Sequence, residues 1–115
     1  MPDSVMTDQA FLVLTALVPA PLHGYGILAK VDELSQESVG LKVGTLYGVL
    51  ARLVEEGLVE PHREEHRSGR LRRYHRLTEA GRDALAAEAH RQAANARVAI
   101  ERLGAHQPAT PRSTG

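Results

Sequence analysis

The segment from Glu79 to Leu103 constrains the fold of this 115-residue chain more than any other part of its sequence. It contains no proline, no glycine after Gly81 and many alanines, and Thr78 precedes it as a good N-cap. The segment therefore predicts one continuous helix of about 25 residues, about 37 Å long. A body built from the preceding residues, about 80 in number, cannot cover a helix of this length. We expect part of it to contact another chain or to remain exposed.

Apolar residues recur along this helix at intervals of four, four, three, four and three, close to the heptad spacing of a coiled coil. The spacing favours homodimerisation through one seam, helped by the first helical segment of the chain. The alternative is an alanine-rich helix that frays beyond Arg91. The predicted interface residues are Leu85, Ala89, Ala93, Ala96, Ile100 and Leu103.

Three shorter helices are predicted before this segment. Thr7 is a plausible N-cap for a first helix from about Asp8 to Val18, where prolines follow. Apolar residues at helical spacing indicate a second helix from Gly24 to Ser35. The same periodicity predicts a third helix from about Val43 to Glu56, and Gly57 stands where a C′ glycine is expected.

Two strand-like runs follow the third helix, Leu58 to Arg63 and Leu71 to Leu77. The residues between them, Glu64 to Arg70, predict a loop, so the two runs form a hairpin. Three helices, a hairpin and a long helix in this order predict a mainly α winged helix-turn-helix with a small β-hairpin and a C-terminal dimerisation helix. In this fold the third helix enters a major groove of DNA and the hairpin lies on the adjacent backbone.

We expect three parts in the chain: a winged helix-turn-helix domain over residues 7–78, the dimerisation helix over residues 79–103, and a disordered tail over residues 104–115. The longest apolar run, Ala10 to Val18, has about half of the length that a membrane-spanning helix needs, so we expect a cytoplasmic protein without a membrane span. The chain has no cysteine, which excludes disulfide scaffolds, thiolate zinc sites and cysteine nucleophiles.

The formal net charge of zero hides a segregated distribution of charged residues. Residues Met1 to Leu41 carry one lysine against five acids, whereas His66 to Arg76 carry five arginines and no acid. Such a local field attracts phosphate in spite of the zero total. Arginine outnumbers lysine twelve to two, which suits recognition of phosphate or guanine but equally fits a genome of biased base composition.

Three blocks of residues stand at the junctions between the predicted elements. They are His23-Gly24-Tyr25-Gly26-Ile27; Gly44-Thr45-Leu46-Tyr47 with Leu50, Arg52, Leu53, Gly57, Leu58 and Val59; and Gly69-Arg70 with Arg72, Arg73, Tyr74, Leu77, Thr78 and Gly81. These blocks and the spacing among them resemble PadR-type transcriptional regulators, and the short single C-terminal helix resembles the compact subgroup of that family. The resemblance covers about Phe11 to Leu103. It implies a homodimeric repressor that binds double-stranded DNA at a palindromic operator.

The predicted DNA contacts lie in the second and third helices and in the hairpin. The N-terminus of the third helix offers free backbone N–H groups and a positive dipole end to phosphate, and hydroxyl and ammonium donors stand beside it. Alternatively, Thr45 only caps that helix, Tyr47 packs under the wing, and Tyr25 is a core residue. The candidates are Tyr25, Lys42, Gly44, Thr45, Tyr47, Arg67, Arg70, Arg72 and Arg73.

We expect at least two hairpin arginines to contact phosphate or the minor groove, although a solvated, charge-rich loop is the usual explanation of a basic run. Strict alternation back from Leu77 places Arg73 and His75 on its face. The other face then carries Arg70, Arg72, Tyr74 and Arg76. On the third helix, Arg52 and Glu56 are expected to form an ion pair, with a DNA contact for Arg52 as the alternative.

Two patterns raise functions other than DNA binding, and their context argues against both. Gly24 to Ala29 matches the Gly-x-Gly-x-x-Ala fingerprint of dinucleotide sites, but no strand runs directly into it and no later βα units follow. His62 and His66 have a ligand-like spacing, but in a hairpin this spacing does not align both imidazoles. The chain also has no Gly-x-Ser-x-Gly elbow and no Walker lysine, so we expect no catalytic site, no cofactor and no metal.

If the protein has an effector, the family resemblance implies the dimer cleft between the first and fourth helices as its place, where a lining of Leu, Val and Ala favours a small apolar molecule. The alternative function is a winged-helix adaptor that docks a protein partner through the alanine seam without binding an operator. The basic hairpin argues against the adaptor.

Overall fold

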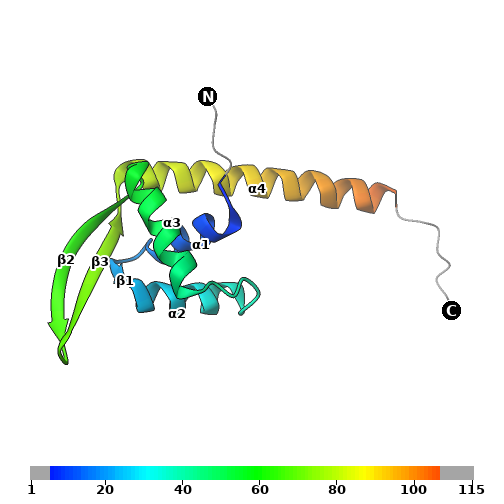
Figure 1. The fold of residues 1–115 in the computed structure, drawn as a ribbon. Helices are drawn as coiled ribbons and strands as arrows, with labels where there is room; N and C mark the ends of the chain where they lie inside the picture. The colour runs from blue at the N-terminus through cyan, green and yellow to red at the C-terminus, as the bar shows by residue number, and fades with distance from the viewer. Residues whose placement is uncertain (1–5, 107–115) are drawn as a thin grey trace.

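The computed structural model describes residues 6–106, which form four helices and a three-stranded antiparallel sheet (Figure 1). The elements are α1 (Asp8–Ala16), β1 (Leu22–His23), α2 (Gly24–Ser35), α3 (Val43–Glu55), β2 (Val59–Arg67), β3 (Arg70–Leu77) and α4 (Glu79–Ala105). The three short helices pack together on one side of α4, and the β2–β3 hairpin projects away from them (Figure 1). This arrangement confirms the predicted fold class, a winged helix-turn-helix with a long C-terminal helix.

Capping residues fix the helix ends. Thr7 accepts a hydrogen bond from the backbone N–H of Ala10 (3.1 Å), which confirms it as the N-cap of α1. Thr78 accepts the equivalent bond from Gly81 (2.9 Å) at the start of α4. Gly57 follows the end of α3 with a positive φ of 79°, and its N–H donates back to the last turn of the helix. These caps explain why the predicted starts of α1 and α4 agree with the structure.

Two helix ends differ from the prediction. α1 ends at Ala16 instead of Val18, because Pro19 disfavours helical backbone at the residue before it. α4 continues by two residues into the predicted disordered tail, so the start of that tail is helical. The part of the tail from residue 107 onward lies outside the described residues.

A two-residue strand, β1, joins the sheet and was not predicted. Leu22 pairs with His75 of β3. His23 pairs with Tyr74, which gives the strand order β1-β3-β2. Because β1 runs directly into α2, this pairing fixes the start of α2 against the hairpin.

The β2–β3 hairpin, residues 59–77, is called the wing below. β2 is longer than predicted, because most of the expected loop from Glu64 to Arg70 is paired with β3. Only Ser68 and Gly69 form the turn, and both have positive φ, 51° and 77°. A two-residue turn of this kind matches the twist of the strands, and glycine adopts it without steric strain. The register shifts once, at a bulge in β2 between Pro61 and Arg63.

The hydrophobic core lies among α1, α2, α3 and the base of the sheet. α4 adds Leu85, which is partly buried against this core, and Gly81, which is fully buried. Gly81 comes so close to the preceding chain that a Cβ there would lie 2.0 Å from the carbonyl oxygen of Leu58. The largest fully buried side chains are Leu14, Leu17, Ile27, Leu46, Val13, Val31 and Val59.

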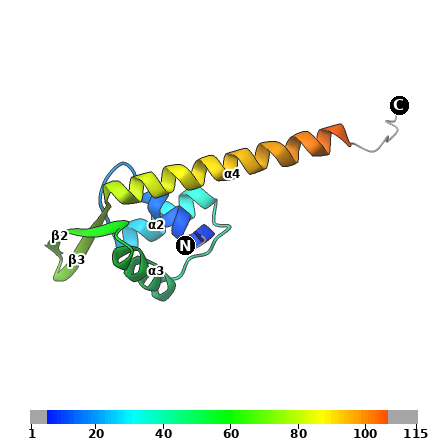
Figure 2. The same cartoon turned by 90° about the horizontal axis from the view of Figure 1, so that it is seen from above.

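Most of α4 extends beyond this body as an isolated helix, which Figure 2 shows from above. Near its far end Val98, Ile100 and Leu103 are 56%, 67% and 72% exposed. Of the predicted seam, Leu85 packs against its own chain and the residues from Ala89 onward are exposed. Among the described helices, α4 included, none combines the length and the apolar character needed to cross a membrane.

Candidate nucleic-acid interface

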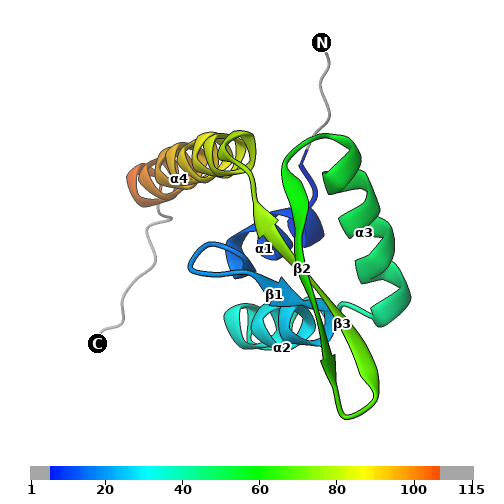
Figure 3. The ribbon, with the colours of Figure 1, turned by 90° about the vertical axis from the view of Figure 1, so that its left-hand side faces the viewer.

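The first turn of α3 exposes its polar side to solvent, because leucines on the opposite side of the helix are buried in the core. Leu46, Leu50 and Leu53 anchor one side of the helix in the core. The helical repeat therefore exposes Gly44 and Thr45 in the first turn. In Figures 1 and 3 this end of α3 and the tip of the wing project toward the same end of the molecule, away from α4. The two elements are placed to meet one elongated partner together.

The N-terminus of α3 gathers hydrogen-bond donors. Lys42 is the N-cap residue, and no side chain caps the helix there. The first-turn N–H groups lack partners within the helix, and they carry the positive end of its dipole. Thr45 is exposed in the first turn, so the interpretation of this residue as a helix cap is wrong. Donors at a helix N-terminus are chemically suited to phosphate.

Two tyrosines stand beside this helix end. Tyr25, in the first turn of α2, is 59% exposed, so its interpretation as a core residue is wrong. Tyr47 is 52% exposed and lines the wing side of α3 without being buried under the wing. Its hydroxyl oxygen lies where a side chain at Gly24 would stand, only 2.7 Å from an added Cβ. The absence of a side chain at Gly24 therefore makes room for Tyr47 in this position.

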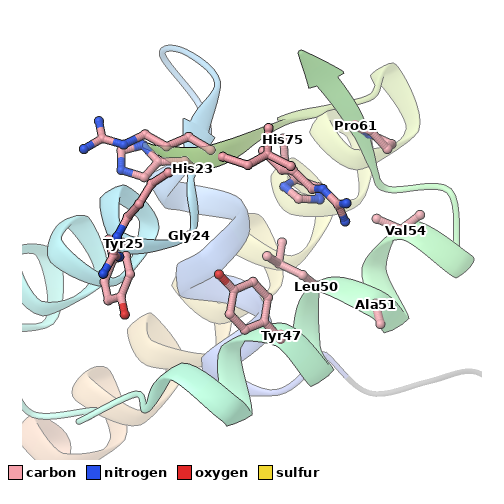
Figure 4. Close-up of a pocket in the computed structure, with 13 residues that line it drawn as sticks. His23, Gly24, Tyr25, Tyr47, Leu50, Ala51, Val54, Pro61 and His75 are labelled. Atoms are coloured by element: carbon pink, nitrogen blue, oxygen red, sulfur yellow. The ribbon is translucent and has the colours of Figure 1, made fainter. Parts of the chain in front are cut away.

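A groove of about 950 Å³ separates α3 from the wing (Figure 4). In Figure 4, Tyr47 and Leu50 of α3 point toward it, and His75 of β3 lies on the opposite wall. The Nδ1 atoms of His75 and His23 are buried without a hydrogen-bond partner among the described residues. Burial lowers the pKa of both imidazoles below the usual value of 6.5, so neither adds positive charge to the groove at neutral pH. The groove owes its positive charge to its arginines, which are Arg70, Arg72 and Arg73.

The wing is less basic than its arginine run suggests, because β3 pairs with a strand that carries three glutamates. Over residues 59–77 the wing has six arginines and three glutamates, a formal charge of +3. The glutamates Glu60, Glu64 and Glu65 stand in register opposite Arg76, Arg73 and Arg72. The arginine run His66 to Arg76 has no acid in sequence, but in space it lies beside these acids.

Cross-strand ion pairs follow from this register. The Nε atom of Arg76 lies 2.7 Å from Oε2 of Glu60 at the base of the wing. The Nε atom of Arg73 lies 3.3 Å from Oε2 of Glu64 further out. Tyr74, on the face of β3 opposite to Arg73, donates a hydrogen bond from its hydroxyl to Glu65 (2.9 Å). These contacts agree with the predicted alternation, which put Tyr74 and Arg73 on opposite faces of β3.

Tyr74 organises a cluster on its face of the wing. The Arg63 guanidinium lies over its ring, 4.0 Å from the centroid, and the His23 ring centroid is 5.2 Å away. Glu65 accepts the Tyr74 hydrogen bond, and this bond, with the charges of Arg63 and Arg67, lowers the pKa of its carboxyl. Glu65 is therefore ionised at neutral pH and remains a partner for cations.

The structure brings the predicted contact residues together at one end of the molecule, in three groups. Lys42, Gly44 and Thr45 stand at the start of α3, Arg67 at the wing tip, and Tyr25, Tyr47, Arg70, Arg72 and Arg73 around the groove. The sequence interpretation missed Arg63 and Glu65, because it ended the first strand at Arg63. The charge alternation Arg63-x-Glu65-x-Arg67 was the available signal.

The ion pair between Arg52 and Glu56 is confirmed, with Nε and Oε2 3.9 Å apart. His62 lies in the β2 bulge, and within residues 6–106 no three His, Cys, Asp or Glu side chains gather into a group that could hold a metal ion.

Comparisons with known proteins agree with this geometry. A family model described as the transcriptional regulator PadR-like family matches residues 13–87. A PadR family transcription regulator from hypervirulent Clostridium difficile has a similar structure, with a TM-score of 0.72 and 27% identity over 84% of this chain and 99% of that chain. Bacillus subtilis PadR, solved in complex with operator DNA, has a similar fold, with a TM-score of 0.59 and 21% identity over 92% of this chain and 53% of that chain.

A similar sequence occurs in an uncharacterized 37.1 kDa protein in transposon TN4556 of Streptomyces fradiae, which is 46% identical over 86 residues. The match covers 75% of this chain and 23% of the relative, so the chain spans about a quarter of that protein's length. The matched family and the Clostridium difficile relative are both described as transcription regulators. Because the family model matches well over half of the chain, this protein belongs to the PadR-like family of transcriptional regulators.

Proposed function

We propose that this PadR-family regulator is a repressor that binds an inverted-repeat operator as a homodimer. One observation carries the proposal: the start of α3, two exposed tyrosines and the wing arginines share one end of the molecule, while α4 lies on the other side (Figures 1 and 3). Bacillus subtilis PadR, which has the same fold, was solved with operator DNA, and this supports DNA as the partner.

In the proposed complex the start of α3 enters a major groove. Gly44 and the first-turn N–H groups approach phosphate, and Lys42 adds a cation beside them. Thr45 lies on the outward side of the helix, within reach of base edges. The hydroxyl groups of Tyr25 and Tyr47 donate to the phosphates that flank the groove.

The wing meets the neighbouring backbone or minor groove. Its contacts come from guanidinium groups, which bind phosphate in a planar, two-pronged geometry. These contacts hold the protein on the duplex without reading its sequence. The proposed set is Arg67, Arg70, Arg72 and Arg73.

The dimer forms through α4. In a single chain the seam leaves Ile100 and Leu103 in water, at 67% and 72% exposure. A second copy carries the same seam, so a two-fold dimer buries both seams against each other and against α1. Two recognition helices then face half-sites about 34 Å apart on one side of the duplex, which requires an inverted repeat. The seam residues are Leu85, Ala89, Ala93, Ala96, Ile100 and Leu103.

We further propose that a small apolar effector binds between α1 and α4 of the dimer and releases the operator. Support comes from α1, where Phe11 and Leu12 are only partly buried within one chain and leave apolar surface beside α4. The proposed place of action is the cytoplasm, where operator DNA is found.

The test combines oligomeric state with DNA binding. Ala93→Glu places like charges in the desolvated seam of both chains, at a cost of several kcal/mol, about 3–5, so we expect monomers with a large loss of operator affinity. Ala94→Glu is the matched control, because the neighbouring position lies about 100° further around the helix, away from the seam. Light scattering measures the mass, and fluorescence anisotropy measures binding to the DNA upstream of the gene that encodes the protein.

Two outcomes would refute the proposal. A monomeric wild-type protein, or an Ala93→Glu dimer with unchanged affinity, would show that the seam is wrong. A dimeric wild-type protein that binds no upstream DNA, even at low salt, would favour the adaptor function instead.

A further inference from the structure

The wing carries an acid among the arginines that would meet DNA. Glu65 lies on β2 between Arg63 and Arg67, two residues from each, and so shares a face of the strand with both. Its Oε2 atom stands 3.5 Å from Nη1 of Arg63 and 4.0 Å from Nη2 of Arg67. One carboxylate thus serves two of the six wing guanidinium groups.

Glu65 is held in this position by Tyr74. The Tyr74 hydroxyl donates to Oε1 of Glu65 (2.9 Å), which leaves Oε2 directed at the arginines. The Tyr74 ring also supports the Arg63 guanidinium at 4.0 Å. The Glu65 side chain is 31% exposed, against 50% and 59% for the two arginines. A positioned and partly shielded carboxylate retains a guanidinium better than a mobile one in bulk water.

We propose that Glu65 is an internal competitor for DNA phosphate, which holds Arg63 and Arg67 and thereby lowers the affinity of the wing for every duplex, whatever its sequence. The inference rests on the proposed DNA-binding function. A phosphate that binds either arginine displaces or shares an existing ion pair instead of meeting a free cation, so the net gain of the contact is smaller.

The same reasoning divides the remaining wing arginines. Glu64 holds Arg73 on the opposite face, at 3.3 Å. Arg70 and Arg72 have no carboxylate within 4.0 Å anywhere in residues 6–106, so a phosphate reaches them without displacing an ion pair. Arg70 and Arg72 are therefore the wing arginines that bind phosphate without breaking an ion pair, and Glu65 sets how much more affinity the wing can add.

Glu65→Gln tests the inference, because glutamine keeps an oxygen for the Tyr74 hydroxyl and loses only the charge. The probe is a mixed-sequence duplex of about three helical turns, titrated by fluorescence anisotropy over a range of KCl concentrations. We expect about 4- to 25-fold tighter binding by a dimer with two wings. The slope of log K against log [KCl] should steepen by about 0.9 for each new arginine–phosphate contact.

Three comparisons separate a local effect from a general one. Glu101→Gln removes the same charge from the exposed far part of α4 and should leave affinity within about 2-fold of wild type, because charges beyond a Debye length are screened. In a background with Arg63→Gln and Arg67→Gln, Glu65→Gln should give a much smaller gain, which comes only from reduced repulsion of phosphate and from Arg72 across the strand. Glu64→Gln, on the opposite face, should give a smaller gain because it releases one arginine.

The outcomes are distinct. Equal gains for Glu65→Gln and Glu101→Gln, or a Glu65→Gln gain that keeps its full size without Arg63 and Arg67, would overturn the inference while leaving DNA binding intact. A wild-type protein that binds no duplex at low salt would overturn the proposed function and this inference with it. Matching thermal melting curves for the variants establish that each is folded.

Discussion

Replacing Gly81 with alanine is expected to destabilise the fold, although alanine is the better helix former. A Cβ at this position would lie 2.0 Å from the carbonyl oxygen of Leu58 and 3.0 Å from its carbonyl carbon. The same oxygen accepts a hydrogen bond from the N–H of Thr78 (3.1 Å), so it is not free to turn away. Because real Cβ contacts begin near 3.0 Å, α4 and the segment before β2 must separate by about 1 Å.

The magnitude follows from two opposing terms. Overpacking costs about 1–3 kcal/mol, and Gly81→Ala belongs at the upper end because the obstacle is backbone and not the end of a flexible side chain. Alanine offsets at most about 1 kcal/mol of this through its helix propensity. The free energy of unfolding should therefore fall by about 2 kcal/mol, which lowers the Tm by about 8–16 °C in a domain of this size.

Thermal melting followed by far-ultraviolet circular dichroism measures this change, at one fixed protein concentration because a dimer melts in a concentration-dependent way. Gly104→Ala is the matched control in the same helix, since nothing lies within 4 Å of the Cβ it would add. It should leave the Tm unchanged or raise it slightly. Gly81→Ala melting at or above the wild-type temperature would show that the close approach does not limit this site.

Three further predictions concern other parts of the structure. Gly24→Ala adds a Cβ 2.7 Å from the Tyr47 hydroxyl, which is the end of a flexible side chain and can move away. The melting temperature should therefore change little, while fluorescence anisotropy should show weaker DNA binding because Tyr47 is displaced. Unchanged DNA binding would show that Tyr47 is not part of the interface. Burial lowers the pKa of His75 in the folded state, so the unfolded state takes up a proton first as the pH falls through 6.5. The free energy of unfolding should therefore decrease over this pH range. Urea titrations should show a smaller decrease for His75→Gln than for the wild-type protein. Hydrogen bonds, first from Arg91 and then from Gln92, lower the pKa of Glu88 to about 2. Arg91→Gln should raise this pKa toward 4.5, which an NMR titration measures. An unchanged pKa would show that the ion pair with Arg91 does not lower it.

The helices could be predicted from the sequence because their signals are local. Thr7 and Thr78 each cap a helix by accepting a hydrogen bond from the N–H group three residues later in the chain. Gly57 is an equally local signal for the end of α3. The period of apolar residues then identifies the buried side of each helix, as for Leu46 and Leu50 in α3. Each of these signals acts over one or two turns, a distance that a single sequence records directly.

The sheet was harder to predict because its partners are distant in the chain. β1 has only Leu22 and His23, too few residues to show a period, and it exists because β3 offers an edge to pair with. The outer part of β2, from Glu64 onward, is polar on both faces and exposed except at Glu65, so no apolar alternation marks it as a strand. Glu60, Glu64 and Glu65 escaped the charge count of His66 to Arg76 because they precede that run in sequence, and only the register places them opposite Arg76, Arg73 and Arg72.

The wing and α4 meet at an angle, so a movement of one element acts on the other through their short connection. Thr78 is the only residue between them. Its N–H donates to the carbonyl oxygen of Leu58 (3.1 Å), and its hydroxyl donates to the carbonyl oxygen of Gly57 (2.6 Å). The same hydroxyl oxygen accepts a hydrogen bond from the N–H of Gly81 (2.9 Å). The junction at Thr78 is therefore held by the turn that follows α3. The wing tip lies about 26 Å from this junction, along the eight residues of β3. If the wing followed α4 as one rigid unit, a rotation of about 5° would carry the tip through about 2 Å, enough to take a guanidinium out of hydrogen-bonding distance of a phosphate. In the proposed dimer, a ligand that changes the angle between the two α4 helices therefore acts on both wings through their base, where Val59 and Leu77 belong to the core and β1 pairs with β3.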